Sequence, residues 1–379
     1  MSRRNSLVLI AALTLAGAAA LGISQEVVRP PLPGGALASR MDWALKEASS
    51  RGFEKGFWIG YSIRRLMGER SSIGSFDHRT RSEATLEEVL SGQRPEYPTL
   101  SREESTRQRA KRVLDDLEKE GQPEKKIWKD VAILARYGKV SKVAPERVDM
   151  SNLNLHFDLK GLPLIWLGEA DDEESLAWLK TTYRETKLEE VKENILAAVG
   201  IHQNPALVVP ILASVLESRE SDELRKNAAF WMGQQNDRKA YEILMQTAKN
   251  DRSPEVKEGA VFAISQIELE ESVDGLIGLA RTADDEEIRK KAVFWLGQKA
   301  SNKATAALKS MAYEGGDTKI QDQAVFALSQ LPGNEGVEAL IKVVKTHPSA
   351  EVRKKAIFWL GETGDPRALE VLIEIIKGK

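Results

Sequence analysis

The sequence predicts a mainly α-helical protein, in which a solenoid of stacked helical pairs follows a small N-terminal α+β module. Two observations carry this prediction. A ten-residue block recurs about every 32 residues in the C-terminal half, whereas the N-terminal half lacks that period and holds short apolar segments instead. The predicted organisation is a signal peptide at 1–24, a linker at 25–40, the α+β module at 41–158 and the solenoid at 159–379.

Composition excludes several classes of function. The 379 residues are 42% hydrophobic and 30% charged, which is enough for a sizeable core, and the net charge of -2 does not indicate nucleic acid as a partner. The chain has no Cys, so disulfides, thiol nucleophiles and Cys-ligated zinc are excluded, and its 4 His are scattered. Phosphate-binding and hydrolase motifs are also missing. We therefore expect no catalytic residue, no metal site and no cofactor.

The first residues have the layout of a secretory signal. Arg3 and Arg4 precede an apolar run from Leu7 to Ile23, and small residues follow. This pattern predicts export to the periplasm or the extracellular space. The alternative is an uncleaved signal that stays as an N-terminal membrane anchor; no other membrane contact is expected.

The predicted module combines helices and strands. Its helix at Met41–Ser50 follows a Pro- and Gly-rich linker, and a polar loop with one short helical turn is expected from Gly68 to Leu100. A second, charged helix is predicted at Arg102–Glu120. Alternation and β-branched residues predict three strands: Gly56–Ile63, Asp130–Tyr137 and Asn152–Asp158.

Internal sequence repeats predict the fold of the second part of the chain. Six copies of the block begin at Val191, Leu224, Val256, Ile288, Ile320 and Val352, and amphipathic segments lie between them, so each repeat holds two helices. The pattern V-R-x-x-A-x-x-x-L-G resembles bacterial HEAT repeats of the phycobilisome-lyase-like type. This resemblance implies an α-solenoid and does not imply lyase chemistry. Asp residues before the block helices are predicted N-caps: Asp251, Asp284 and Asp317.

A longer period is superimposed on the first. The eighth residue of the block alternates between Trp and Ala, in the order Ala198, Trp231, Ala263, Trp295, Ala327 and Trp359. Gly and Ser alternate two positions later. This predicts a double repeat of about 64 residues, with each Trp in the core beside the small residues of its neighbours. Trp166 and Gly168 keep the phase and suggest one further copy near Leu159.

The block also repeats residues away from its apolar stripe. Similarity to HEAT repeats implies that these helices line the concave surface, where two rows of side chains and two flanking Lys form a candidate partner-binding site: Phe230, Phe262, Phe294, Phe326, Phe358, Gln234, Gln266, Gln298, Gln330, Lys290 and Lys354. Amides can bond an extended peptide while aromatic rings bury its side chains. The alternative interpretation is that the Phe side chains only pack between neighbouring repeats.

These patterns predict a non-enzymatic, exported scaffold that binds a protein or peptide segment, with no nucleic-acid partner. No His is followed by Glu, so the iron ligands of HEAT-like hydroxylases are missing. Two alternatives stay open. One is self-assembly into a homo-oligomer through the apolar edge of the helix Arg367–Ile376. The other is an enzyme whose site in the N-terminal module includes Trp58, Tyr61, Asp77 and His78.

Overall fold

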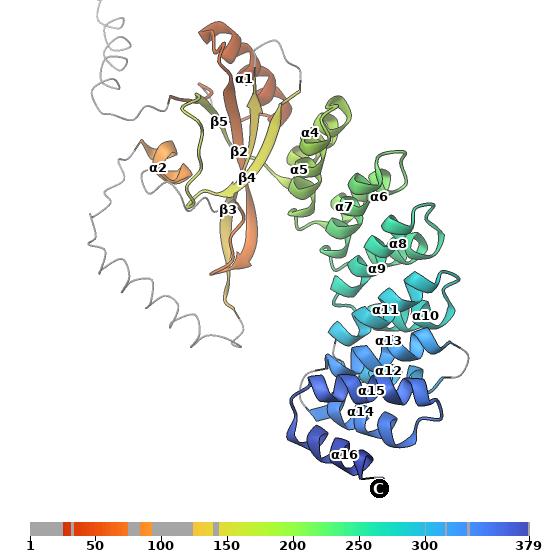
Figure 1. The fold of residues 1–379 in the computed structure, drawn as a ribbon. Coiled ribbons are helices and arrows are strands. Elements are labelled where there is room, and N and C mark those ends of the chain that lie inside the picture. The colour runs from red at the N-terminus through yellow and green to blue at the C-terminus, as the bar shows by residue number, and fades with distance from the viewer. Residues whose placement is uncertain are drawn as a thin grey trace, which may run out of the picture. The chain divides into compact units, whose positions relative to one another are not determined.

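The computed structural model describes residues 26–31, 34–74, 84–92, 124–138, 144–299, 301–314, 317–331 and 334–377. It divides into two compact units, Met1–Ala198 and Val199–Lys379 (Figure 1). The predicted signal at 1–24, the predicted helix Arg102–Glu120, and Asp77 and His78 lie outside the described residues.

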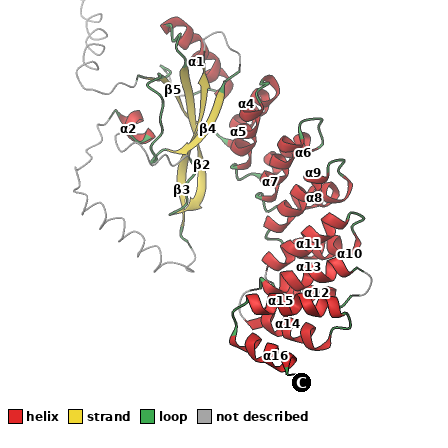
Figure 2. Ribbon diagram, in the orientation of Figure 1, coloured by secondary structure: helices red, strands yellow, loops and turns green. Residues whose placement is uncertain are grey.

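A five-stranded mixed sheet forms the centre of the first unit (Figure 2). Its strand order is β1-β5-β2-β3-β4, in which β1, β5 and β2 run parallel and the pairs β2–β3 and β3–β4 are antiparallel. The strands are β1 (Val27–Val28), β2 (Phe57–Gly68), β3 (Lys126–Tyr137), β4 (Arg147–Asn152) and β5 (Leu164–Glu169). The helix α1 (Leu37–Arg51) confirms the predicted first helix, and β2 and β3 confirm and extend two predicted strands.

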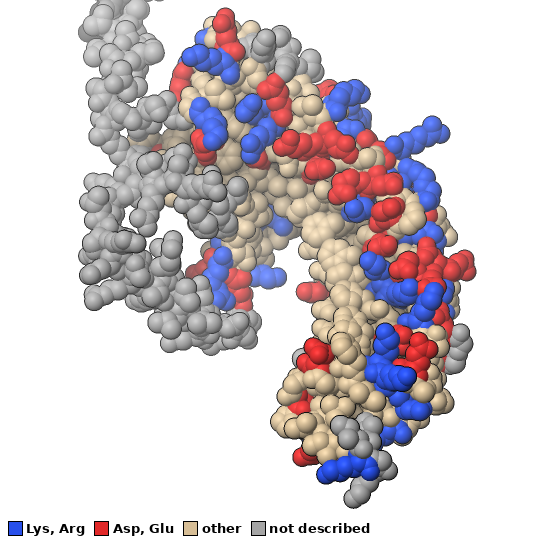
Figure 3. Space-filling model, in the orientation of Figure 1, with Lys and Arg blue, Asp and Glu red and all other residues tan. Residues whose placement is uncertain are grey.

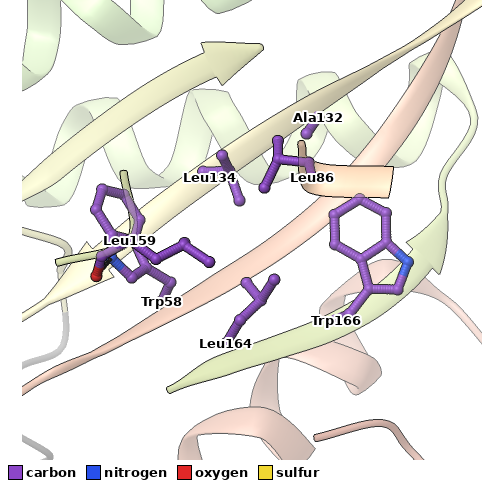
Figure 4. Close-up of a cluster of buried hydrophobic side chains, with 7 residues drawn as sticks. All are labelled: Trp58, Leu86, Ala132, Leu134, Leu159, Leu164 and Trp166. Carbon is purple, nitrogen blue, oxygen red and sulfur yellow. Dashed lines mark hydrogen bonds between the residues drawn. The ribbon is translucent and has the colours of Figure 1, made fainter. Parts of the chain in front are cut away.

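Alternation along β2 sends successive side chains to opposite faces of the sheet. Trp58 joins an apolar cluster beneath the short helix α2 (Leu86–Ser91), where its indole N–H donates to the carbonyl of Leu159 at 3.1 Å (Figure 4). Tyr61 faces α4 (Asp172–Glu185), and its hydroxyl lies 2.9 Å from that of Ser175. Both aromatic side chains are buried, and they lie on opposite faces, so the predicted pocket containing them together is wrong.

Two other predictions for this unit are wrong. Asn152–Asp158 is not a strand: β4 ends at Asn152, and Leu153 and Phe157 pack against the apolar cluster from the turn and loop that follow. Leu164–Glu169, assigned to a first solenoid copy, is the strand β5, whose Ile165 pairs with Ile59 of β2. Its apolar run is buried on both faces, which is typical of a strand with parallel neighbours.

Helical pairs make up the second unit (Figure 1). The predicted block helices are α5 (Glu189–Gly200), within which the two units divide, α7 (Asp222–Gly233), α9 (Pro254–Gln266), α11 (Glu286–Lys299), α13 (Thr318–Ser329) and α15 (Ala350–Glu362). Each block helix is followed by one further helix, and these are α6 (Pro205–Leu216), α8 (Arg238–Asn250), α10 (Glu270–Thr282), α12 (Asn302–Met311), α14 (Asn334–Thr346) and α16 (Pro366–Ile376). From α7 to α15, successive block helices pack on one another, which confirms the solenoid.

Capping residues explain where the block helices begin. Asp317 caps α13 as predicted, because its carboxylate accepts the amides of Lys319 and Ile320. Before α9, Ser253 is the cap and Asp251 accepts the amide of Ser253 instead. The prediction for Asp284 is wrong, since the neighbouring Asp285 accepts the amide of Glu287 at 2.9 Å.

Within the described residues, no helix combines the length and apolar character that a membrane crossing needs.

Candidate functional site

The repeated Phe and Trp side chains form one continuous series of ring contacts along the solenoid, which we call the aromatic ladder. It consists of Phe230, Trp231, Phe262, Phe294, Trp295, Phe326, Phe358 and Trp359. Rings stack across α7–α9 and across α11–α13, with centroids 6.1 and 6.4 Å apart. The series continues through Phe262–Trp295 and Phe326–Trp359 contacts at 4.8 and 4.7 Å. Five helices therefore contribute to a single aromatic surface.

Two kinds of contact between neighbouring block helices, which we call junctions, alternate along the solenoid and produce this series. A Cβ atom on Gly233 would lie 2.6 Å from the carbonyl oxygen of Ala263, and one on Gly297 would lie 3.1 Å from the Cβ of Ala327. Each Trp-containing helix therefore approaches the next Ala-containing helix closely, and the two Phe rings stack. At the alternate junctions Ser replaces Gly and Trp replaces Ala, so the Trp ring extends the series. This is the predicted double repeat, built on Gly–Ala contacts.

The ladder is only partly covered by its neighbours. Phe230, Phe262, Phe294 and Phe326 are half-buried, and Phe358 is 56% exposed. Trp231, Trp295 and Trp359 are also half-buried, so their assignment to the core is only partly right. Each Trp ring is directed toward the Phe before it and lies edge-on to that ring, with centroids 4.9 to 5.1 Å apart. The Trp and Phe rings therefore form one partly exposed surface.

The four Gln of the second predicted row are exposed. Gln266 and Gln330 each donate to the hydroxyl of the preceding Ser at 3.0 Å. The side-chain amides of Gln234 and Gln298 make no hydrogen bond within the part of the chain that the structure describes. Each Gln follows a ladder Phe by four residues and so lies on the same side of its helix.

Lys side chains near the ladder are mostly paired with carboxylates. Lys290 contacts Glu286 at 2.6 Å and Glu287 at 2.9 Å, and its hydrogen bond lowers the pKa of Glu286 to about 2, with Lys319 adding to the effect. The same contact with Glu286 raises the pKa of Lys290. Lys354, in contrast, is exposed and has no ion pair among the described residues. The two predicted Lys therefore differ in charge environment.

A groove of about 560 Å³ lies over the ladder at α9 and α11. Its aromatic lining comes from Phe262, Phe294 and Trp295, and the other lining residues are Lys226, Glu255, Glu258, Gly259, Glu287, Lys290, Lys291 and Gln323. Lys226 pairs with Glu223 and Lys291 with Glu258, both at 2.8 Å. An uncharged strip runs beside the charged residues along the solenoid (Figure 3). The groove is therefore aromatic inside and nearly neutral at its margin.

Two Arg residues that sequence reasoning did not single out hold this surface in register. Arg225 is buried, donates to the carbonyl of Leu216 at 3.1 Å and pairs with Asp251 before the next block helix. Arg289 pairs in the same way with Asp317 at 3.1 Å. One sequence feature could have identified these Arg residues: Arg occupies the second position of the block only in the Trp-containing copies.

Among the described residues, no group of three or more His, Cys, Asp or Glu side chains is placed to hold a metal ion.

Comparison with known proteins identifies the repeats. Residues 209–297 and 305–379 match HEAT repeats, so this part of the chain is an α-solenoid of HEAT repeats. A search of the curated proteins finds no significant match.

Three solved structures are similar to part of this chain. Human deoxyhypusine hydroxylase is 21% identical over 52% of this chain and 77% of its own, with a TM-score of 0.24. The CpcE–CpcF complex of phycocyanin lyase from Nostoc is 20% identical over 53% and 79%, with a TM-score of 0.31. Importin beta is 16% identical over 54% and 33%, with a TM-score of 0.34.

Proposed function

We propose that the protein is a non-enzymatic scaffold whose aromatic ladder binds an extended segment of another protein. The observation that carries this proposal is the continuity of the ladder: half-buried rings from five successive block helices contact one another without interruption. Rings that served only to fill space between repeats would be covered by those repeats. Here each ring keeps a part of its surface for a ligand.

Hydrogen-bonding groups beside the rings suit a peptide backbone. Each amide of the Gln row offers a donor and an acceptor, which are the two groups that an extended chain presents in alternation. Gln234 and Gln298 have no competing partner among the described residues. Side chains of the bound segment would lie on Phe262, Phe294 and Trp295, where aromatic contacts supply most of the affinity.

Charge at the groove favours an apolar segment over a polyanion. Lys226, Lys290 and Lys291 are already paired with carboxylates of the same or the neighbouring helix. A nucleic acid would need free cations along its path, and its binding would weaken steeply with salt. We therefore expect binding to this groove to depend only weakly on ionic strength.

We also propose that the protein is exported, as its first residues predict. N-terminal sequencing of protein recovered from the envelope and the medium tests this. A mature N-terminus near residue 25 would support a cleaved signal, and an intact N-terminus in the membrane fraction would support an anchor.

A selected peptide tests the binding proposal. Random 12-residue peptides would be displayed and selected on the full chain, and the strongest binder would be titrated by fluorescence anisotropy. We expect enrichment in apolar residues and at least a tenfold loss of affinity in Phe294→Ala/Phe326→Ala, with unchanged circular dichroism. Trp128→Ala is the matched control, because Trp128 is 59% exposed in the sheet of the other unit. Equal loss in both variants, or none in either, would contradict the proposal.

A further inference from the structure

The last helical pair exposes apolar positions that earlier pairs bury. Leu369 of α16 is 62% exposed, although the residues at its position in the three preceding repeats are nearly covered: Val273 8%, Thr305 4% and Val337 7%. Phe358 of α15 is 56% exposed, whereas the other Phe of the ladder are half-buried. These side chains define a surface that we call the α15–α16 face.

In earlier repeats the next block helix covers the corresponding face. Its contacts show which residue types fit there. Over α11 that helix is α13, and three of its contacts define the fit. Its cap Asp317 pairs with Arg289 at 3.1 Å, and Phe326 stacks on Phe294 with centroids 6.4 Å apart. The third contact sets Ala327 against Gly297, where an added Cβ atom would lie 3.1 Å from the Cβ of Ala327.

Among the described residues, no helix covers the same three positions on α15. Arg353 donates to the carbonyls of His347 and Pro348 at 2.6 and 3.0 Å but forms no ion pair among the described residues. A Cβ atom on Gly361 would approach nothing closer than the Leu372 side chain, at 4.0 Å. Phe358 contacts Trp359 edge-on, and no ring from a following helix lies on its other side in the described chain.

We propose that the α15–α16 face binds an amphipathic helix of a partner protein. The internal contacts specify its chemistry: an acidic residue at its N-terminus for Arg353, and a Phe–Ala pair in its third turn for Phe358 and Gly361. Apolar side chains of the same helix cover Leu369. A second copy of this chain is a poor donor of that helix. The helices that carry these residues, α9 and α13, already lie between neighbouring block helices.

A helical probe tests this proposal independently of the groove, because Leu369 and Arg353 do not line the groove. The probe is a lactam-stapled, fluorescent peptide with the sequence of residues 317–331, which covers α11 in the intact chain. It would be titrated into the full chain. We expect saturable one-to-one binding that Leu369→Ser weakens about tenfold or more. Leu188→Ser is the control, since Leu188 is 50% exposed and lies in the first unit.

The charge contact gives a second readout. Arg353→Gln should weaken the Asp-capped probe about two- to fivefold and leave a probe with Asp317→Asn unaffected, as expected for a solvent-accessible ion pair. Equal effects on both probes, or no saturable binding, would overturn the proposal. Sedimentation of the full chain provides the last outcome: a dimer that Leu369→Ser dissociates would assign the face to a second copy and would also overturn it.

Discussion

One substitution at two equivalent glycines should have opposite effects on stability. Gly233 and Gly361 occupy the same position of the block, in α7 and α15. A Cβ atom at Gly233 would lie 2.6 Å from the backbone oxygen of Ala263 and 3.0 Å from its Cα, so α7 and α9 would have to separate. At Gly361 the nearest atom is 4.0 Å away and belongs to a flexible side chain.

The magnitudes follow from two competing terms. Replacing Gly by Ala inside a helix stabilises it by about 0.5–1 kcal/mol, and only this term acts at Gly361. At Gly233 overpacking against a backbone atom costs about 3 kcal/mol, which leaves a net loss of about 2 kcal/mol. Urea unfolding of Gly233→Ala and Gly361→Ala, followed by circular dichroism, measures both. A Gly233→Ala variant as stable as the parent chain would refute the close Gly–Ala junction.

Further predictions concern the ion pairs and the groove. Arg225→Met should lower the unfolding free energy by about 3 kcal/mol, because it leaves Asp251 and the Leu216 carbonyl without their buried partner; an unchanged urea midpoint would contradict this. Arg281 lowers the pKa of Glu314 through a hydrogen bond, so this pair stabilises the fold above the ordinary pKa of 4.5 and ceases to do so as the pH falls through the lowered value. Arg281→Gln should therefore cost about 0.5 kcal/mol at pH 7 and nothing near pH 2, and a constant difference in thermal midpoint across that range would argue against the pair. Affinity of the groove for a selected peptide should change less than about threefold between 50 and 500 mM NaCl, and a steep loss would indicate that free cations bind the ligand.

Periodic features of the sequence predicted the solenoid well because each copy repeats the same physical demands. Six blocks gave six block helices, and the alternation of Trp with Ala corresponds to alternating junctions between helices. Positions of the Phe and Gln rows were also predictable, since helical geometry fixes which side of the helix they share. How far each ring is covered was not, because coverage depends on the neighbouring helix. The Trp residues are therefore half-buried where the core was expected.

The predictions were wrong where one sequence pattern is compatible with two different local structures. Trp166 and Gly168 fell in phase with the repeat, yet their segment pairs with β2 as a strand. Leu153, Leu155 and Phe157 alternate as a strand would, but Leu153 and Phe157 pack on the apolar cluster from a turn and a loop. The Arg289–Asp317 contact joins residues 28 positions apart, and one sequence does not reveal which of several carboxylates an Arg will meet.

The most direct measurement asks whether a bound segment touches the aromatic ladder. Phe294 would be replaced by p-benzoylphenylalanine in the full chain, and the selected peptide would be photo-crosslinked to it, with the same replacement at Trp128 as the reference. We expect an adduct at position 294 that unlabelled peptide competes away, and none at position 128. A peptide that still binds but forms no adduct at 294, or forms it at 128, would contradict recognition by the ladder.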